Sequence, residues 1–252
     1  MKKLVGKTVL ITGGNGGIGL ATAQLFLEQG ARIAITGRDK DSLDHAQQVL
    51  GPETLVVQSD TGKVGEIEAL MQKVQAHFGH LDVLFVNAGA SQPAPFDKVG
   101  EALFDDVVAT NFKGVFFTVQ KALPILARGA SVIVTTSISN QRGSPHFGVY
   151  AACKAAQRSL VQTLSLELIP HGVRINAVSP GPINTPTFGQ RWGVPQEVVQ
   201  AARADFVRKS PMKRFGEPDE VAKTVLFLAS DDSSYLVGTE IVVDGGASLP
   251  LL

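Results

Sequence analysis

Cysteine is nearly absent from this sequence, with Cys153 the only one among 252 residues. A single thiol allows neither an intrachain disulfide nor a thiolate metal cluster. Net charge is also lacking, because 23 basic residues balance 23 acidic ones, and a chain without basic excess is not favoured as a nucleic-acid binder. No apolar run approaches the roughly 18 residues of a membrane span. These absences favour a cytoplasmic protein that binds neither nucleic acid nor membrane.

Hydrophobic residues make up 44% of the chain and charged residues 18%, the balance of a globular protein. Short apolar segments rich in Val and Ile alternate with longer amphipathic ones. The apolar segments are residues 8–12, 32–36, 54–58, 83–87, 131–135, 173–178 and 239–243. The helical patterns include residues 18–29, 64–78, 102–126 and 149–169. Strands that are apolar throughout are covered on both faces, so we expect one α/β domain over residues 1–252, a doubly wound parallel sheet of about seven strands.

One stretch, residues 182–218, follows neither pattern and is rich in proline. Long irregular segments in compact domains are usually functional lids or disordered. The aromatic residues Phe188, Trp192, Phe206 and Phe215 favour order. We therefore expect a structured substrate lid at about residues 186–211.

The first apolar segment runs directly into a glycine-rich turn, and a helical pattern follows. The turn reads Gly13-Gly14-Asn15-Gly16-Gly17-Ile18-Gly19. Glycines allow a tight turn and let backbone N–H groups at a helix N-terminus approach a pyrophosphate. Glycines alone are a weak signal, but the preceding strand and following helix strengthen it. The segment predicts a dinucleotide site.

The end of the second apolar segment indicates which dinucleotide is preferred. NAD-specific sites carry an acid there to bind the ribose 2′-hydroxyl. This chain has Gly37 at that position and Arg38 next. A guanidinium has the donor geometry to bind a 2′-phosphate, and the missing carboxylate removes a repulsion. The sequence therefore favours NADP(H) over NAD(H).

Four polar residues form a candidate catalytic set. Tyr150 and Lys154 are four apart in a helical pattern and so share one face. A phenol with a pKa near 10 is a poor acid and base at neutral pH, and a nearby ammonium is expected to lower that pKa. Ser137 follows the apolar segment 131–135 and can donate a hydrogen bond to a carbonyl oxygen. Asn111 lies in a separate helical pattern.

The spacing Thr12-Gly13-x-x-x-Gly17-Ile18-Gly19, with this Asn–Ser–Tyr–Lys set, resembles the short-chain dehydrogenase/reductase family in its compact single-domain branch. The resemblance spans residues 7–246 and implies a Rossmann-type fold. It implies that Tyr150 exchanges a proton with the substrate oxygen and Ser137 steadies that oxygen. Lys154 would hold the nicotinamide ribose and tune Tyr150, and Asn111 would anchor a water of a proton relay.

The resemblance also implies cofactor contacts. Asp60 and Thr61 are similar to the family's pair of residues beside the adenine. Residues 87–89 are similar to the family's Asn-Ala-Gly turn, and residues 180–185 are similar to the segment that holds the nicotinamide carboxamide. The implied cofactor-binding residues are Gly13, Asn15, Gly17, Ile18, Gly19, Arg38, Asp60, Thr61, Asn87, Ala88, Gly89, Tyr150, Lys154, Pro180, Gly181, Ile183 and Thr185.

Residues 136–141 and 147–150 resemble those of carbonyl reductases and secondary alcohol dehydrogenases. The implied reaction is hydride transfer between NADP(H) and a small-molecule ketone or secondary alcohol. The expected substrate-contacting residues are Ser139, Phe147, Phe188 and Trp192. The resemblance further implies a homotetramer, with the helical segments 102–126 and 149–169 bundled at one interface and the C-terminal residues 243–252 at a second.

Two alternatives remain open. A 3-oxoacyl carrier-protein reductase shares all these motifs and needs a basic docking patch. Candidates for that patch are Arg142, Arg191, Arg203, Arg208, Lys209, Lys213 and Arg214. A non-catalytic NADPH-binding regulator typically loses the tyrosine or the lysine, and both are present here. His77 and His80 lack a third nearby ligand, so no metal site is expected.

Overall fold

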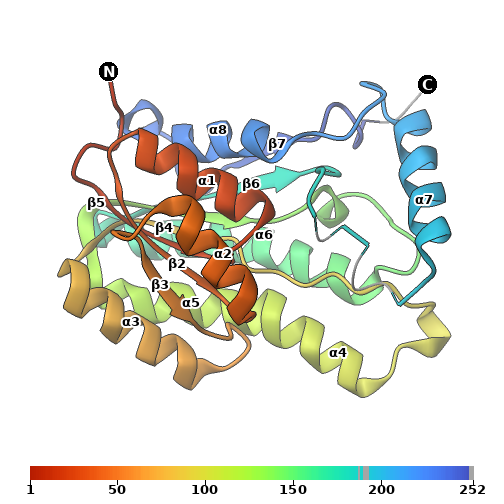
Figure 1. Cartoon of the computed structure of the whole chain (residues 1–252), viewed down its shortest axis with the longest axis horizontal. Coiled ribbons are helices and arrows are strands. Elements are labelled where there is room, and N and C mark those ends of the chain that lie inside the picture. Colours follow the sequence, from red (N-terminus) through yellow and green to blue (C-terminus); the bar gives the residue numbers. More distant parts are fainter. Residues whose placement is uncertain (187, 190–192, 250–252) are drawn as a thin grey trace.

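The computed structural model describes residues 1–186, 188–189 and 193–249. Over these residues seven parallel strands form one sheet in the order β3-β2-β1-β4-β5-β6-β7 (Figure 1). The strands are β1 (Thr8–Thr12), β2 (Arg32–Gly37), β3 (Leu55–Gln58), β4 (Leu81–Val86), β5 (Leu126–Thr135), β6 (Arg174–Pro180) and β7 (Glu240–Val243). The predicted doubly wound parallel sheet is confirmed. Because the strand order reverses between β1 and β4, a crevice is expected outside the carboxyl ends of these two strands.

Helices cover both faces of the sheet (Figure 1). They are α1 (Gly17–Glu28), α2 (Lys40–Leu50), α3 (Val64–Phe78), α4 (Glu101–Val108), α5 (Gly114–Ala122), α6 (Gly148–Leu168), α7 (Gln196–Lys209) and α8 (Pro218–Ala229). One hydrophobic cluster joins the sheet to α3, α5 and α6, and a second joins it to α1, α2 and α8. None of the helices described is both long and apolar enough to cross a membrane.

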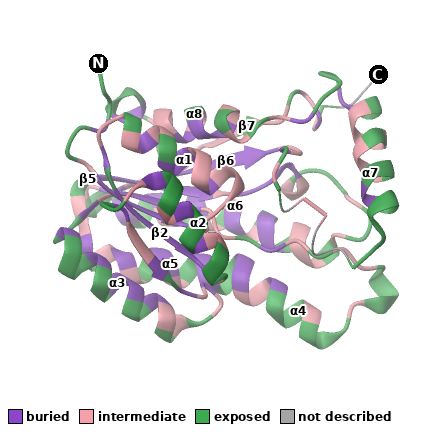
Figure 2. Cartoon of the chain, viewed as in Figure 1, coloured by how far each residue is buried: buried purple, intermediate pink, exposed green. Residues whose placement is uncertain are grey.

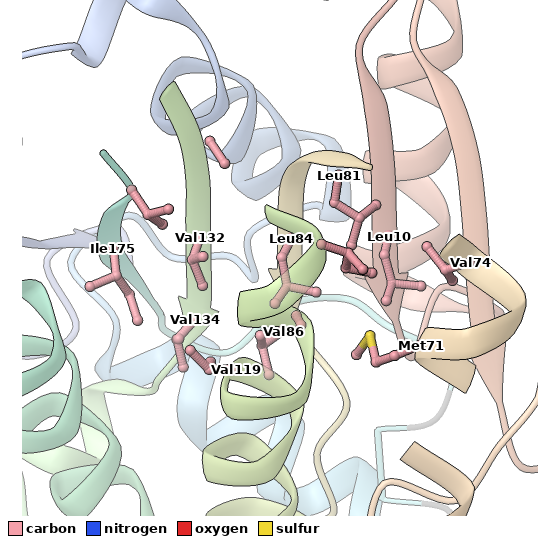
Figure 3. Close-up of a cluster of buried hydrophobic side chains, with 14 of the residues drawn as sticks. Leu10, Met71, Val74, Leu81, Leu84, Val86, Val119, Val132, Val134 and Ile175 are labelled. Carbon is pink, nitrogen blue, oxygen red and sulfur yellow. The ribbon is translucent and has the colours of Figure 1, made fainter. Parts of the chain in front are cut away.

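The inner strands β1, β2, β4 and β6 are largely buried on both faces, as their apolar sequences predict, whereas the edge strands β3 and β7 are only partly buried. Along β1, Leu10 belongs to the cluster under α3 and α5, drawn in Figure 3, whereas Val9 and Ile11 belong to the cluster under α1 and α8. Successive side chains of a strand point to opposite faces, so a strand between two helix layers needs apolar residues at every position. Figure 2 shows this buried centre with exposed residues on the outer helix faces.

The helix expected over residues 102–126 is interrupted. Helix α4 passes at residue 109 into a π-helical turn, η2 (Ala109–Lys113), before α5 begins. Asn111 lies in that turn and donates to the carbonyls of Val107 and Ala90, 2.9 and 2.8 Å away. Pro124 lies in the short 3₁₀ turn that follows α5, where the lack of an N–H helps to end the helix. Strand β5 therefore begins at Leu126, earlier than expected.

The expected lid at residues 186–211 contains more regular structure than its sequence suggested. Helix α7 occupies residues 196–209, and its Phe206 packs edge-on against Phe215 with ring centroids 5.3 Å apart. Phe188 also packs edge-on against Phe215, at 5.2 Å. Trp192 lies outside the described residues. The aromatic side chains thus join the two ends of the lid, as residues of a structured segment would.

Candidate active site

The glycine-rich turn joins β1 to α1 at the carboxyl edge of the sheet. A Cβ atom at Gly19 would overlap the carbonyl oxygen of Gly13, so the close approach of turn and helix requires glycine there. The N-cap of α1 is Gly16, which has no side chain that could cap the helix. A helix N-terminus of this kind leaves its first N–H groups for another acceptor and suits a phosphate.

At the end of β2, Asn15 lies over Gly37. A Cβ at Gly37 would lie 2.5 Å from the Asn15 Cγ, and Asn15 Nδ2 donates to the Ser42 hydroxyl 2.7 Å away. An acidic side chain at residue 37 would displace Asn15. The neighbouring Arg38 is partly exposed, and its Nη1 lies 3.9 Å from a carboxylate oxygen of Asp106, itself mostly exposed. Such a long, solvated ion pair contributes little, so the guanidinium can engage another anion.

The turn after β4 is held against β1 and β5. The backbone N–H groups of Asn87 and Ala88 donate to the Thr12 hydroxyl at 3.0 and 3.1 Å. Asn87 Nδ2 donates to the Gly13 carbonyl at 3.2 Å, and its Oδ1 accepts from the Thr135 hydroxyl at 3.2 Å. This turn therefore fixes the glycine-rich segment relative to the strand that precedes Ser137.

Asp60 and Thr61 follow β3. The Asp60 Oδ1 accepts from the Gly62 N–H at 2.9 Å and so shapes its own turn. Thr61 is buried, and its backbone carbonyl packs so closely against Gly114 that a Cβ at residue 114 would overlap it. Neither residue lines the large cavity described below, so a contact with the adenine stays a prediction.

The segment 180–185 follows β6 and approaches the glycine-rich turn. Gly181 donates its N–H to the Val243 carbonyl of β7 at 2.9 Å, and Ile183 pairs with Gly216 in a parallel bridge. A Cβ at Gly17 would lie 2.9 Å from the Thr185 Cγ2. Thr185 therefore lies beside the start of α1.

A cavity of about 650 Å³ opens at the carboxyl edge of the sheet. The predicted site residues that line it are Ile18, Asn87, Gly89, Ser137, Ser139, Phe147, Tyr150, Lys154, Pro180, Gly181, Ile183, Thr185 and Phe188. The predicted residues that do not line it are Gly13, Asn15, Gly17, Gly19, Arg38, Asp60, Thr61, Ala88 and Asn111. Most of the second group lie in the turns after β1, β2 and β3. The cavity thus brings together three of the four proposed catalytic residues, all but Asn111, and the proposed nicotinamide-side residues.

Tyr150 lies in the first turn of α6, with the Phe147 ring edge-on at 6.1 Å between centroids. Burial raises the pKa of the Tyr150 phenol, and a hydrogen bond with Ser137 opposes that rise. The expected lowering of the Tyr150 pKa is therefore wrong, because the net shift is upward. The phenolate would be desolvated in this position, and that cost outweighs the favourable contacts.

Lys154 is buried, one helical turn after Tyr150. Its Nζ donates to the Thr135 carbonyl at 2.6 Å and to the Gln157 Oε1 at 3.1 Å, and it lies 5.6 Å from the centre of the Tyr150 ring. Burial lowers the pKa of Lys154 to about 7. Because no carboxylate faces the ammonium among the hydrogen bonds and ion pairs of the described residues, desolvation dominates.

Asn111 is fully buried and is not a cavity-lining residue. Its Oδ1 accepts from the Ala90 N–H at 3.1 Å, and its side-chain amide holds the π-helical turn as described above. Its backbone carbonyl accepts a hydrogen bond from Gln157 Nε2. The polar groups of Asn111 are thus bonded within the protein, and the expected water of a proton relay stays a prediction.

Sequence reasoning missed two polar residues at this site. Gln157 follows Lys154 by three residues, a spacing that could have suggested a contact on one helix face. Glu240, in β7, gave no such signal. Its buried carboxylate accepts from Thr136 at 2.5 Å and from Asn140 at 2.6 Å, and it lies 3.4 Å from the Arg158 guanidinium. Glu240 therefore anchors both sides of the turn that carries Ser137.

A doubly wound sheet with a glycine-rich turn before its first helix, opening on a crevice at its carboxyl edge, is typical of dinucleotide-binding proteins. A family model described as enoyl-(acyl carrier protein) reductase matches residues 13–248. The chain belongs to the short-chain dehydrogenase/reductase family, whose members are oxidoreductases that bind a nicotinamide cofactor.

Similar proteins match over nearly the whole chain. An oxidoreductase named asL5 from Sarocladium schorii is 40% identical, over 98% of this chain and 97% of its own. The 3-oxoacyl-[acyl-carrier-protein] reductase FabG of Thermotoga maritima is 36% identical, over 97% of this chain and 98% of its own. The crystal structure of levodione reductase is 32% identical with a TM-score of 0.92, over 99% of this chain and 100% of that one.

Proposed function

We propose that this chain is a single-domain, NADP(H)-dependent reductase that transfers a hydride between nicotinamide and a ketone or secondary alcohol, with Tyr150 as the general acid and base. The observation that carries the proposal is the convergence of Ser137, Tyr150 and Lys154 on one cavity beside the glycine-rich turn. A phenol, a hydroxyl and an ammonium around one cavity can bind and protonate a single carbonyl oxygen.

The preference for NADP(H) is supported by the end of β2. Gly37 leaves no room for an acid beneath Asn15, and Arg38 next to it is partly exposed with only a weak ion pair. A carboxylate would repel a 2′-phosphate, whereas a guanidinium can donate two hydrogen bonds to it. These residues fit a phosphorylated ribose better than a free 2′-hydroxyl.

Bound NADPH would supply the hydride that reduces the carbonyl carbon. Residues of this chain bind and protonate the carbonyl oxygen. Ser137 donates a hydrogen bond that holds the carbonyl oxygen, and Tyr150 gives its phenolic proton to that oxygen as charge develops. The phenol is protonated at neutral pH, and because burial raises its pKa it donates the proton only where the phenolate that forms is stabilised. The Lys154 ammonium, 5.6 Å from the ring centre, stabilises the phenolate left behind.

The walls of the cavity favour an apolar ketone. Phe147 and Phe188 line it, and helix α7 contributes Ala202 and Phe206. Ser139 adds a polar group near Ser137. The similarity to a levodione reductase supports a carbonyl substrate. A cyclic or aromatic ketone suits an aromatic wall of this kind.

The second candidate is a 3-oxoacyl carrier-protein reductase, supported by the 36% identity to the Thermotoga protein. Several cations of the docking patch that this function requires are paired with carboxylates of the same chain. Arg214 pairs with Glu220 at 2.7 Å, and Lys209 and Arg208 pair with Asp205 at 2.6 and 2.5 Å. Arg191 lies outside the described residues. Cations already paired with neighbouring carboxylates attract an acidic partner less strongly.

The experiment that separates these functions is the oxidation of NADPH with a panel of substrates. Small, cyclic and aromatic ketones are compared with a 3-oxoacyl thioester on carrier protein and on a short pantetheine mimic. Turnover of free ketones supports the proposal, and turnover only on the carrier protein supports the second candidate. NADPH binding without turnover on any substrate would indicate a non-catalytic regulator.

The proposal includes a cytoplasmic homotetramer. Large apolar side chains are exposed on neighbouring helices, with Phe104 on α4, Phe116 on α5 and Leu166 on α6 at 48%, 36% and 77% exposure. Apolar residues grouped on packed helices commonly mark a contact with another chain. A second copy of this chain is the partner that family membership favours.

A further inference from the structure

Gln157 is one of the fully buried polar side chains of this protein, at 0% exposure. It lies on α6, one turn beyond Lys154, and faces the π-helical turn η2. Its Nε2 donates to the backbone carbonyl of Asn111, and its Oε1 accepts from Lys154 Nζ at 3.1 Å. Both ends of one amide are thus used, one on Lys154, which lines the cavity, and one on the π-helical turn η2, which does not.

A buried amide is costly unless both its donor and its acceptor are hydrogen-bonded, and one that is fully bonded holds its partners in place. A carbonyl in an α-helix usually accepts from the N–H four residues on, and the π-helical turn disturbs that pattern at η2. The Asn111 carbonyl of this turn accepts a hydrogen bond from Gln157. The oxygen end of the same amide then points to the ammonium of Lys154, where it favours the charged form.

We propose that Gln157 is a positioning residue of the active site, whose side-chain amide couples the π-helical turn at Asn111 to Lys154 and keeps that lysine oriented and protonated at neutral pH. The inference rests on the proposed function, in which the Lys154 ammonium stabilises the Tyr150 phenolate. Gln157 acts only through Lys154, because it does not line the cavity.

The surroundings of Lys154 make this role specific. Its other acceptor is the Thr135 carbonyl of β5, a neutral group. The titratable side chains that face it are Tyr150, on the same helix, and the neighbouring Cys153, and burial raises the pKa of both. Gln157 is therefore the side-chain acceptor of the ammonium among the hydrogen bonds of the described residues.

The test compares Gln157→Met, Gln157→Glu and the wild type. Methionine keeps a similar volume and removes both hydrogen bonds, whereas glutamate keeps the acceptor and adds a negative charge. The first readout needs no cofactor: NMR titration of the lysine Cε–Hε signals in cofactor-free protein, with the Lys154 signal assigned by its loss in Lys154→Arg. The second readout is the pH profile of kcat/KM for NADPH-dependent ketone reduction.

Loss of the amide acceptor should lower the Lys154 titration midpoint by about one to two pH units in Gln157→Met. Gln157→Glu should raise the midpoint, because a carboxylate beside the ammonium favours its charged form. With a midpoint near 7 in the wild type, the protonated fraction at pH 7 should fall about five- to fifty-fold in Gln157→Met, and kcat/KM should fall with it.

Val161→Ala controls for general damage, because Val161 is buried one turn further along α6 and its truncation leaves a cavity. That variant should lower the melting temperature without moving the Lys154 midpoint. Equal midpoints in the wild type and both Gln157 variants would overturn the inference and leave Gln157 a packing residue. A wild type that reduces no substrate would refute the proposed reaction, but the cofactor-free titration would still decide the role of Gln157.

Discussion

The side chain of Asn15 occupies the space that a side chain at Gly37 would need, with the Asn15 Cγ 2.5 Å from the Cβ position of residue 37. This contact joins the glycine-rich turn to the end of β2. It accounts for the missing acid at the proposed site of the cofactor ribose and leaves Arg38 as a charged side chain next to it. The choice between the two nicotinamide cofactors is therefore expected to depend on Arg38.

Replacement of Arg38 by alanine should weaken NADPH binding by about ten- to a hundred-fold, the usual effect of a lost charge-assisted hydrogen bond. NADH binding should change little, since NADH has no 2′-phosphate. Fluorescence titration of both cofactors measures this. Lys40→Ala is the matched control, because Lys40 is an exposed cation nearby that is paired with Asp44. Equal losses for NADH and NADPH would contradict the assignment.

Lys154 should make the stability of the cofactor-free protein depend on pH. Its pKa is about 7 in the fold and close to the ordinary lysine value of 10.5 when unfolded. Between these values the unfolded chain binds a proton that the folded chain does not, so the free energy of unfolding rises with pH by at most about 1.4 kcal/mol per unit from this group. Below pH 7 both the folded and the unfolded chain bind the proton, so the dependence from this group ends there.

Urea unfolding at pH 7, 8 and 9 tests that dependence. Lys154→Met should show a flatter rise in the free energy of unfolding than the wild type. The exposed Lys40→Met should keep the wild-type slope. If Lys154→Met and the wild type run parallel over this range, the lysine is not buried in its neutral form.

Phe188 should influence which ketone is accepted. It lines the cavity just after Thr185 and packs against Phe215. Phe188→Ala would remove an aromatic wall from the substrate side, so the ranking of ketones by kcat/KM should change while the affinity for NADPH stays within about threefold. Trp192→Ala is expected to act in the same way. A change confined to cofactor affinity would remove this segment from the substrate site.

The exposed apolar side chains of α4 and α6 should hold the oligomer together. Light scattering of the wild type is expected to give about four times the chain mass of 26.6 kDa. The double variant Phe104→Lys/Leu166→Lys places charges in the expected interface and should give a smaller mass. Tyr235→Lys, at a fully exposed residue elsewhere, should leave the mass unchanged. A wild-type mass near 26.6 kDa would rule out the tetramer.

The sequence predicted the sheet well, because strands buried on both faces must be apolar at every position. Element ends were less predictable. The π-helical turn at Asn111 depends on contacts with Ala90, which is 21 residues away in sequence. Helix α7 was hidden by the prolines around it, and its amphipathic character is weak.

The sequence predicted the site residues that belong to a recognisable motif. It did not predict the residues that hold those motif residues in place. Tyr150, Lys154 and Ser137 do converge on one cavity. The anchoring of the Ser137 turn by Glu240 joins residues about 100 positions apart and leaves no local pattern. The direction of the Tyr150 pKa shift also depends on burial, which spacing alone does not give.

The central claim is that the Tyr150 phenol protonates the substrate oxygen. Its direct test is the rate of NADPH oxidation by Tyr150→Phe with the best ketone of the panel, beside Tyr235→Phe, which alters the only other tyrosine at an exposed position. Loss of the general acid should slow turnover by about 100- to 10,000-fold, with NADPH affinity nearly unchanged and Tyr235→Phe at the wild-type rate. Turnover by Tyr150→Phe close to that of the wild type would contradict the mechanism.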